Sequence, residues 1–213
     1  MAEEQSKIVI AGCGPGSPDY LTPAVRQAVA LADVLVGAKH LLALFPEHRA
    51  EKITVTADIE TLLKEVASHR DRKRIVVLVT GDPGLCSLAL PVLRHFGLQA
   101  CEVIPGVSAL QVAFARIGID WLDACIIDAH GKNPDIDPAA LNDGKIAVFA
   151  GRPEAIRWTA GLAQRLGKDR RIYLCENLTL PDESVRLISS DDLERCPTSS
   201  RTIVLMIKEE FFK

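Results

Sequence analysis

The sequence lacks a surplus of charge of either sign: 25 lysines and arginines stand against 28 aspartates and glutamates, a formal net charge of −3. Proteins that bind nucleic acid or a membrane surface through bulk electrostatics carry a clear excess of basic side chains, so we expect neither partner. The most apolar region, Leu21–Phe45, is interrupted by Arg26, Asp33 and Lys39 and lacks the pattern of a membrane span. The acidic, polar start of the chain does not have the pattern of a signal peptide.

Paired metal-ligand motifs are also missing. The six cysteines are scattered, without a Cys-x-x-Cys pair and without a histidine at ligand spacing. Such cysteines are typical of reduced packing residues in a cytoplasmic protein, and we expect no metal site. The sequence also contains no Gly-x-Ser-x-Gly nucleophile turn and no Gly-Lys-Ser/Thr phosphate loop.

Strands and helices alternate five times in the first half of the chain, which predicts a mostly parallel, doubly wound α/β sheet. Ile75–Val79 is the clearest strand, because five apolar residues without polar alternation suit a position covered on both faces. Thr22 and Asp58 are expected helix N-caps, and Gly97 is an expected C-terminal cap. The other expected strands are Lys7–Cys13, Asp33–Val36, Ile53–Thr56 and Cys101–Ile104.

The pattern changes after Gly118, where a helix is expected to end, so we place a domain boundary between residues 1–118 and residues 119–213. The later strands are separated mostly by short polar connections, apart from one long helix that starts at Pro153 and stops at Gly167. Short connections imply antiparallel or mixed pairing, so the second domain is predicted to be α+β. Its expected strands are Ala124–Ala129, Lys145–Ala150, Arg171–Glu176, Ser184–Ser189 and Arg201–Lys208.

Three strands of the first half end in loops that contain glycine, namely Gly12–Gly16, Gly81–Gly84 and Gly106. Because the carboxyl ends of parallel strands meet at one edge of a sheet, we expect these loops to line a crevice there. Asp82 is the charged group at the end of the buried strand Ile75–Val79, where it would either cap the next helix or face a ligand.

These loops are a poor match to a nucleotide-phosphate site. Pro15 and Pro18 remove backbone N–H groups that a pyrophosphate would need. The second strand ends in Val-Gly-Ala-Lys, without the carboxylate that binds a ribose in the dinucleotide fold. A dinucleotide-dependent oxidoreductase is therefore an alternative rather than the favoured function.

The order and separation of the glycine loops resemble the tetrapyrrole methylase superfamily. The matching segments are Gly12–Gly16 with Tyr20–Thr22, then Gly81–Pro83, then Ile104–Ala109. Two later segments, Ala129–Lys132 and Cys175–Glu183, are similar to the branch of this family that methylates carbon 5 of precorrin-7 or cobalt-precorrin-7. Lys132 stands where that branch carries arginine, which keeps the charge and loses bidentate geometry. Ala150 stands where several relatives carry methionine.

The resemblance implies a two-domain tetrapyrrole methylase fold that binds S-adenosylmethionine in a cleft closed by the second domain. This cofactor has no phosphate and carries a sulfonium cation, so Asp82 would stay ionised beside it. Transfer of its activated methyl group to an electron-rich ring carbon depends on positioning more than on acid–base groups. By family position the cofactor residues are Pro15, Thr80, Gly81, Asp82, Leu85, Ser108, Ala109 and Ala150.

A precorrin substrate carries many carboxylates and must lose a proton, and the sequence offers groups for both. Lys39, Lys132 and Arg152 each follow a strand, where they would bind substrate carboxylates or be solvated surface charges. His130 directly follows a buried strand and is the candidate for assisting the loss of the proton. The remaining histidines are expected to be solvated side chains: His40, His48, His69 and His95.

The unpaired cysteines favour a cytoplasmic protein, and by the same resemblance it would be a homodimer that works beside a separate decarboxylating carbon-15 methyltransferase. The nearest alternative is a methyltransferase of the same fold that acts on another precorrin or on a ribosomal RNA ribose. An RNA substrate would need a broader basic face than this sequence predicts. A dinucleotide-dependent oxidoreductase and a non-catalytic subunit are the alternatives from other classes.

Overall fold

The computed structural model describes residues 6–141, 144–197 and 199–212. It divides into two compact units, one reaching to Ser108 and the other beginning at Ala109. Among the described residues, no helix is long and apolar enough to cross a membrane.

The first unit is built on a five-stranded sheet with the strand order β3-β2-β4-β1-β5. The strands are β1 (Ile8–Gly12), β2 (Val34–Gly37), β3 (Glu51–Thr54), β4 (Ile75–Val79) and β5 (Cys101–Ile104). Every neighbouring pair is parallel, as the alternation of strands and helices predicts. All five residues of β4 are buried, which is the position that their continuous apolar run predicts.

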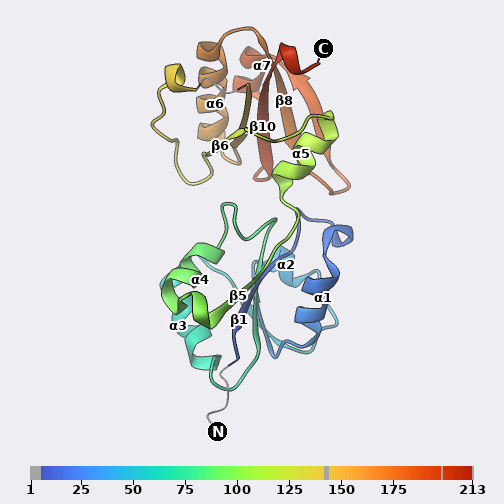
Figure 1. The fold of residues 1–213 in the computed structure, drawn as a ribbon, viewed down its shortest axis with the longest axis vertical. Coiled ribbons are helices and arrows are strands. Elements are labelled where there is room, and N and C mark those ends of the chain that lie inside the picture. The colour runs from blue at the N-terminus through green and yellow to red at the C-terminus, as the bar shows by residue number, and fades with distance from the viewer. Residues whose placement is uncertain (1–5, 142–143, 198, 213) are drawn as a thin grey trace. The chain divides into compact units, whose positions relative to one another are not determined.

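Helices cover both faces of this sheet (Figure 1). They are α1 (Pro23–Ala30), α2 (Lys39–Leu42), α3 (Ile59–His69) and α4 (Ala89–Phe96). The apolar side chains of α3 and α4 share one core cluster with the sheet, and those of α1 and α2 share another. The predicted caps are confirmed, because Thr22 Oγ1 and Asp58 Oδ1 each accept a backbone N–H of the first helical turn, and Gly97 ends α4 with a φ of 82°.

The second unit is built on a mixed sheet with the strand order β6-β7-β10-β8-β9. The strands are β6 (Cys125–Asp128), β7 (Lys145–Phe149), β8 (Arg170–Glu176), β9 (Ser184–Ile188) and β10 (Thr202–Lys208). β6 is parallel to β7, whereas β10 is antiparallel to both β7 and β8, and β8 is antiparallel to β9. The carboxyl ends of β6, β7 and β8 therefore lie at one edge, together with the amino end of β10.

The helices of the second unit are α5 (Ala109–Ile117), α6 (Pro153–Leu166) and α7 (Ser190–Arg195). Short 3₁₀ turns occupy Pro18–Tyr20 and Leu98–Ala100 in the first unit, and Pro138–Ala140 and Glu209–Phe212 in the second. α6 packs on the sheet and α7 packs on α6. α5 lies against β10, so it groups with the second unit, whereas the sequence placed the boundary after it, at Gly118.

Candidate functional site

The three glycine loops of the first unit meet at one edge of its sheet. They follow β4, β1 and β5, which are direct neighbours in the parallel order, so their carboxyl ends lie side by side. The first two loops are bonded to each other, since the Cys13 N–H donates to the Val79 carbonyl at 2.9 Å and the Gly81 N–H donates to the Gly14 carbonyl at 2.8 Å. Backbone hydrogen bonds thus join the loops after β1 and β4 at the edge where the sequence predicts them to meet.

Glycine is required where these loops cross. A Cβ atom on Gly12 would lie 2.6 Å from the Gly106 nitrogen and 2.7 Å from Cδ of Pro83, which is closer than real Cβ atoms approach. A Cβ atom on Gly106 would overlap the carbonyl oxygens of Gly12 and Gly81. The absence of side chains therefore lets three backbone segments touch, a tolerance that only glycine provides.

The carboxylate of Asp82 ties two of the loops together. Its Oδ1 accepts the Gly84 N–H at 2.8 Å, and its Oδ2 accepts the Gly106 N–H at 3.1 Å. One bond closes the turn after β4 and the other reaches the loop after β5. Each oxygen of an ionised carboxylate has a second lone pair, so the group can hold the loops and still face a cationic ligand.

The chemistry of this edge suits a cation better than a phosphate. The segments Gly12–Ser17, Thr80–Ser87 and Pro105–Ser108 contain one carboxylate, Asp82, and no lysine or arginine. Cys13 is not a nucleophile here, because burial raises the pKa of its thiol to about 12. What the loops offer is main-chain N–H and carbonyl groups, a half-buried Leu85, a buried Pro15 and a buried Ser108.

A neighbouring strand adds a side chain to this edge that the sequence did not single out. Nε2 of His40, in the short helix after β2, lies 3.1 Å from Oγ1 of Thr80, and both residues are exposed. The sequence predicted a solvated histidine, and the residue is exposed, but the contact of its ring with a predicted cofactor residue was not foreseen. The contact follows from the order β2-β4, which no local sequence pattern contains. Lys39, the residue before His40, is exposed.

Apart from Ala109, which begins α5, the predicted residues of the second unit gather at the shared edge of β6, β7, β8 and β10. The Ala129 N–H donates to the Phe149 carbonyl at 3.1 Å, and the Ala150 N–H donates to the Thr202 carbonyl at 2.9 Å. The Asn177 N–H donates to the Arg201 carbonyl at 3.1 Å. These bonds place the His130 loop, the Gly151 turn and the segment after β8 in one row.

His130 is exposed and lies against the Gly151 turn. Its N–H donates to Oδ1 of Asp128 at 2.8 Å, which fixes the start of the loop after β6. A Cβ atom on Gly151 would lie 3.2 Å from Nδ1 of His130 and would overlap the Ser200 carbonyl. Glycine at 151 therefore allows the imidazole and the segment before β10 to come together.

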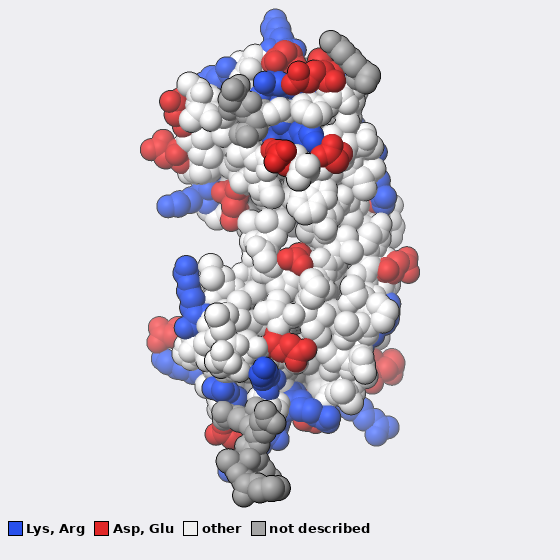
Figure 2. Space-filling model, in the orientation of Figure 1, with Lys and Arg blue, Asp and Glu red and all other residues white. Residues whose placement is uncertain are grey.

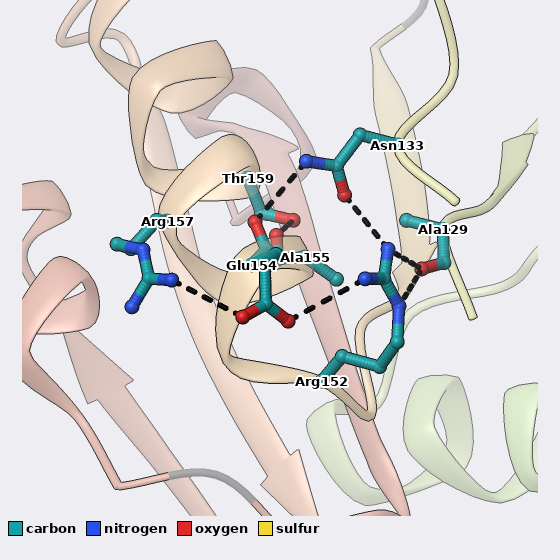
Figure 3. A network of polar contacts seen from close by, with 7 residues as sticks. All are labelled: Ala129, Asn133, Arg152, Glu154, Ala155, Arg157 and Thr159. Carbon is teal, nitrogen blue, oxygen red and sulfur yellow. Dashed lines mark hydrogen bonds and ion pairs between the residues drawn. The ribbon is translucent and has the colours of Figure 1, made fainter. Parts of the chain in front are cut away.

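Arg152 holds the same loop in place (Figure 3). Its Nε and Nη2 donate to the Ala129 carbonyl at 3.3 Å and 3.1 Å, and Nη2 also donates to Oδ1 of Asn133 at 2.9 Å. Its Nη1 lies 3.5 Å from a carboxylate oxygen of Glu154. The sequence assigned Arg152 to the substrate, but the structure directs most of its donors into the protein. Lys132, in the loop that Arg152 holds, is exposed.

One groove of about 620 Å³ lies elsewhere in the first unit, beside α1 and β5. It contains Val9, Ala28, Leu31 and Glu102 but none of the predicted site residues. The candidate site is therefore defined by the two loop edges and not by this groove.

Comparison with known proteins identifies the family. The family model described as tetrapyrrole (corrin/porphyrin) methylases matches residues 7–194. The chain belongs to the tetrapyrrole methylase family. It is 35% identical over 179 residues to the cobalt-precorrin-7 C(5)-methyltransferase of Salmonella typhimurium, covering 84% of this chain and 88% of the relative. It is 31% identical over 211 residues to the probable cobalt-precorrin-7 C(5)-methyltransferase of Methanocaldococcus jannaschii, covering 95% and 99%.

Solved structures of this family have the same fold. A precorrin-6Y methylase from Archaeoglobus fulgidus superposes with a TM-score of 0.73 at 23% identity, over 95% of this tetrapyrrole methylase and 98% of that chain. A uroporphyrin-III C-methyl transferase from Thermus thermophilus, complexed with S-adenyl homocysteine, gives a TM-score of 0.77 at 20% identity, over 95% and 97%. The fold, the family and the methyltransferase class that the sequence predicts are confirmed.

Proposed function

We propose that this tetrapyrrole methylase transfers a methyl group from S-adenosylmethionine to carbon 5 of cobalt-precorrin-7 or precorrin-7, a step in building the corrin ring. The relatives that carry this activity in their names match most of the chain. The structural observation that supports the proposal is the first loop edge, where glycine loops that contain no lysine or arginine converge on one carboxylate. Such an edge favours a cationic ligand that lacks phosphate.

S-adenosylmethionine supplies an already activated methyl group when it is bound. The residues that we propose to hold it are the family positions named from the sequence. In the first unit, Asp82 fixes the two loops and lends negative charge near the sulfonium and ammonium groups. Main-chain atoms of Gly81 and its neighbours bind the uncharged parts of the ligand. The full set is Pro15, Thr80, Gly81, Asp82, Leu85 and Ser108 in the first unit, and Ala109 and Ala150 in the second. That the second unit closes a cleft over the cofactor stays a prediction.

The tetrapyrrole is proposed to use the exposed basic side chains of both units. Lys39 and Lys132 are exposed and are proposed to bind substrate carboxylates, whereas Arg152 is proposed to act by holding the loop that carries His130. His130 is proposed to accept the proton that leaves the macrocycle, because its ring is exposed beside a turn that glycine keeps open.

Three further points belong to the proposal; the location rests on the unpaired cysteines, and the other two rest on the family resemblance alone. We propose that the protein acts in the cytoplasm, that it forms a homodimer, and that a separate decarboxylating carbon-15 methyltransferase works beside it. Light scattering of the purified protein measures the dimer directly. A monomer at micromolar concentration would contradict that part of the proposal and leave the reaction untouched.

The reaction is tested with purified protein, S-adenosylmethionine carrying an isotope-labelled methyl group, and the tetrapyrrole with and without cobalt. The expected product gains one labelled methyl group at carbon 5, identified by mass spectrometry and nuclear magnetic resonance. Methylation of a different precorrin, and not of this one, would overturn the assigned substrate. Binding of NAD(P) without binding of S-adenosylmethionine would overturn the reaction class.

A methylated RNA would contradict the proposal in another way. On the face that Figure 2 shows, the basic and acidic side chains of the described residues are interspersed over both units and form no broad basic field there. Backbone contacts to RNA are built from such fields, so this face gives no support to an RNA substrate.

A further inference from the structure

The segment that follows β8 is held in a strained backbone conformation. Asn177 and Thr179 have φ values of 50° and 70°, in the left-handed region that non-glycine residues rarely adopt. Thr179 is β-branched, for which this region is particularly unfavourable. Such strain persists where the surrounding structure enforces it, and it occurs most often at functional sites.

Side chains within and beside the segment enforce this conformation. Nδ2 of Asn177 donates to Oδ2 of Asp182 at 2.8 Å, and the Ser199 hydroxyl donates to Oδ1 of Asn177 at 2.7 Å. The Thr179 N–H donates to Oε2 of Glu183 at 2.5 Å. Leu178 is buried beneath. The stretch Asn177–Glu183, which we call the clamp loop, is thus closed on itself.

Glu183 connects the clamp loop to α5 through Arg116. Nε of Arg116 donates to Oε1 of Glu183 at 2.5 Å, and Nη2 donates to Oε2 at 3.2 Å, a bidentate pair. Arg116 lowers the pKa of Glu183 below its usual range, so the carboxylate that accepts the Thr179 N–H stays ionised. The Glu183 side chain is 23% exposed and that of Arg116 is 40% exposed, so the pair is partly sheltered from solvent. Both residues belong to the second unit.

The clamp loop lies in the row of loops at the candidate substrate edge. Ser199 bonds to Asn177, its neighbour Ser200 lies against Gly151, and Gly151 lies against His130. Contacts therefore run without a break from His130 to the clamp loop and on to Arg116. A displacement of the clamp loop would therefore also displace the residues in contact with it along this row, as far as His130.

We propose that Arg116 and Glu183 are positioning residues for the tetrapyrrole. They do not touch it; they keep the clamp loop in the strained conformation that the substrate meets, at the edge where His130 also lies. The inference rests on the proposed function, because it assigns the second edge to the tetrapyrrole. Arg116 was not among the residues that the sequence singled out, since its partner lies 67 positions along the chain.

The test compares Arg116→Gln with a matched pair at the other edge of the same sheet. Nε of Arg171 donates to both carboxylate oxygens of Glu209 at 3.1 Å and 3.0 Å, so Arg171→Gln removes a similar pair from the start of β8. The full-length proteins are assayed for KM and kcat with cobalt-precorrin-7, for S-adenosylmethionine affinity by calorimetry, and for thermal stability. Arg116→Lys keeps the positive charge but cannot form the bidentate pair of hydrogen bonds with Glu183.

Arg116→Gln is expected to raise KM for the tetrapyrrole by about tenfold, with kcat at saturation and cofactor affinity within about twofold of the wild type. Arg116→Lys should recover part of the loss, and Arg171→Gln should leave KM unchanged. An unchanged KM in Arg116→Gln, or an equal rise in Arg171→Gln, would overturn the inference. If Arg116→Gln does not fold, Glu183→Gln carries the same test, because it keeps an oxygen for the Thr179 N–H and loses the charge. A wild type that binds S-adenosylmethionine but methylates no tetrapyrrole would instead overturn the proposed function, and this inference with it.

Discussion

Asp82 is the residue whose interpretation the structure changes most. The sequence placed it as a ligand-facing carboxylate at the end of a buried strand. Both of its oxygens accept backbone N–H groups, from Gly84 in its own turn and from Gly106 in the loop after β5. Its charge is therefore used first to join two loops, and any effect on a cationic ligand comes in addition.

Asp82→Ala is expected to weaken both the fold of the first unit and the cofactor affinity. The Gly106 and Gly84 N–H groups would lose their acceptors, at a cost of about 2 kcal/mol in the free energy of unfolding. The loops would separate, and the affinity for S-adenosylmethionine should fall by about tenfold or more. Asp82→Asn keeps one acceptor oxygen but turns an amide NH₂ toward the other N–H donor, so we expect an intermediate effect.

Urea unfolding measures the first effect and calorimetry the second. Asp191→Ala is a suitable control, because this carboxylate is exposed on α7 and accepts a side-chain bond from Gln164. If Asp82→Ala lowered the stability while the cofactor affinity stayed at the wild-type value, Asp82 would be a structural residue alone.

At the scale of elements, the loop edge of the first sheet depends on backbones that touch. Gly106→Ala places a methyl group on the carbonyl oxygens of Gly12 and Gly81, which belong to two other loops and cannot all move away. We expect a loss of at least ~3 kcal/mol in the free energy of unfolding, together with loss of cofactor binding. Denaturation followed by fluorescence measures the first quantity.

Gly161→Ala is the matched control for this substitution. Gly161 lies inside α6, and a Cβ atom there meets nothing within 4 Å. Alanine should stabilise this helix by roughly 0.5 to 1 kcal/mol, because glycine is a poor helix former. Equal behaviour of the two alanine variants would contradict the crowding that the structure shows at Gly106.

Elements were predictable where their signals are local. The run Ile75–Val79, the caps Thr22 and Asp58, and the stop at Gly97 are each contained in a few neighbouring residues, and all four appear in the structure as expected. The parallel first sheet followed from the alternation of strands and helices. The end of the first unit did not, because it depends on α5 packing against β10, a contact made far along the chain.

The site was predictable in part for the same reason. Glycine loops after parallel strands must share an edge, so their meeting could be deduced from the sequence. The bond between His40 and Thr80 depends on which strand neighbours β4, and the bonds of Arg152 depend on the path of the loop after β6. Strand order and loop path are non-local, and no pattern within the sequence specifies them.

At the scale of the whole molecule, charged groups should define the acid limit of stability. Carboxylates of both units have pKa values below their usual range, because each accepts hydrogen bonds from a cation or from backbone N–H groups: Asp33, Glu51, Asp58, Asp120 and Glu183. A pKa that is lower in the folded state gives stability that is present above the unfolded value and is lost as the pH falls through the folded value. The free energy of unfolding should therefore decrease below about pH 4, as urea titrations at several pH values would measure. A constant value down to about pH 2 would contradict the ion pairs.

Two buried thiols should contribute to the alkaline limit. Burial raises the pKa of Cys13 in the first unit and of Cys175 in the second to about 12, from an ordinary value of 9.0. The folded state keeps these protons while the unfolded chain releases them, so stability is present below the ordinary pKa and is lost as the pH rises toward 12.

The double variant Cys13→Ala/Cys175→Ala removes both groups, and lysine, tyrosine and arginine titrate alike in it and in the wild type. The wild type should therefore lose more unfolding free energy than the double variant between about pH 8 and pH 10, measured by urea titration of both proteins side by side. If the unfolding free energies of the two proteins fell equally with pH, the two thiols would be less buried than they are in the structure.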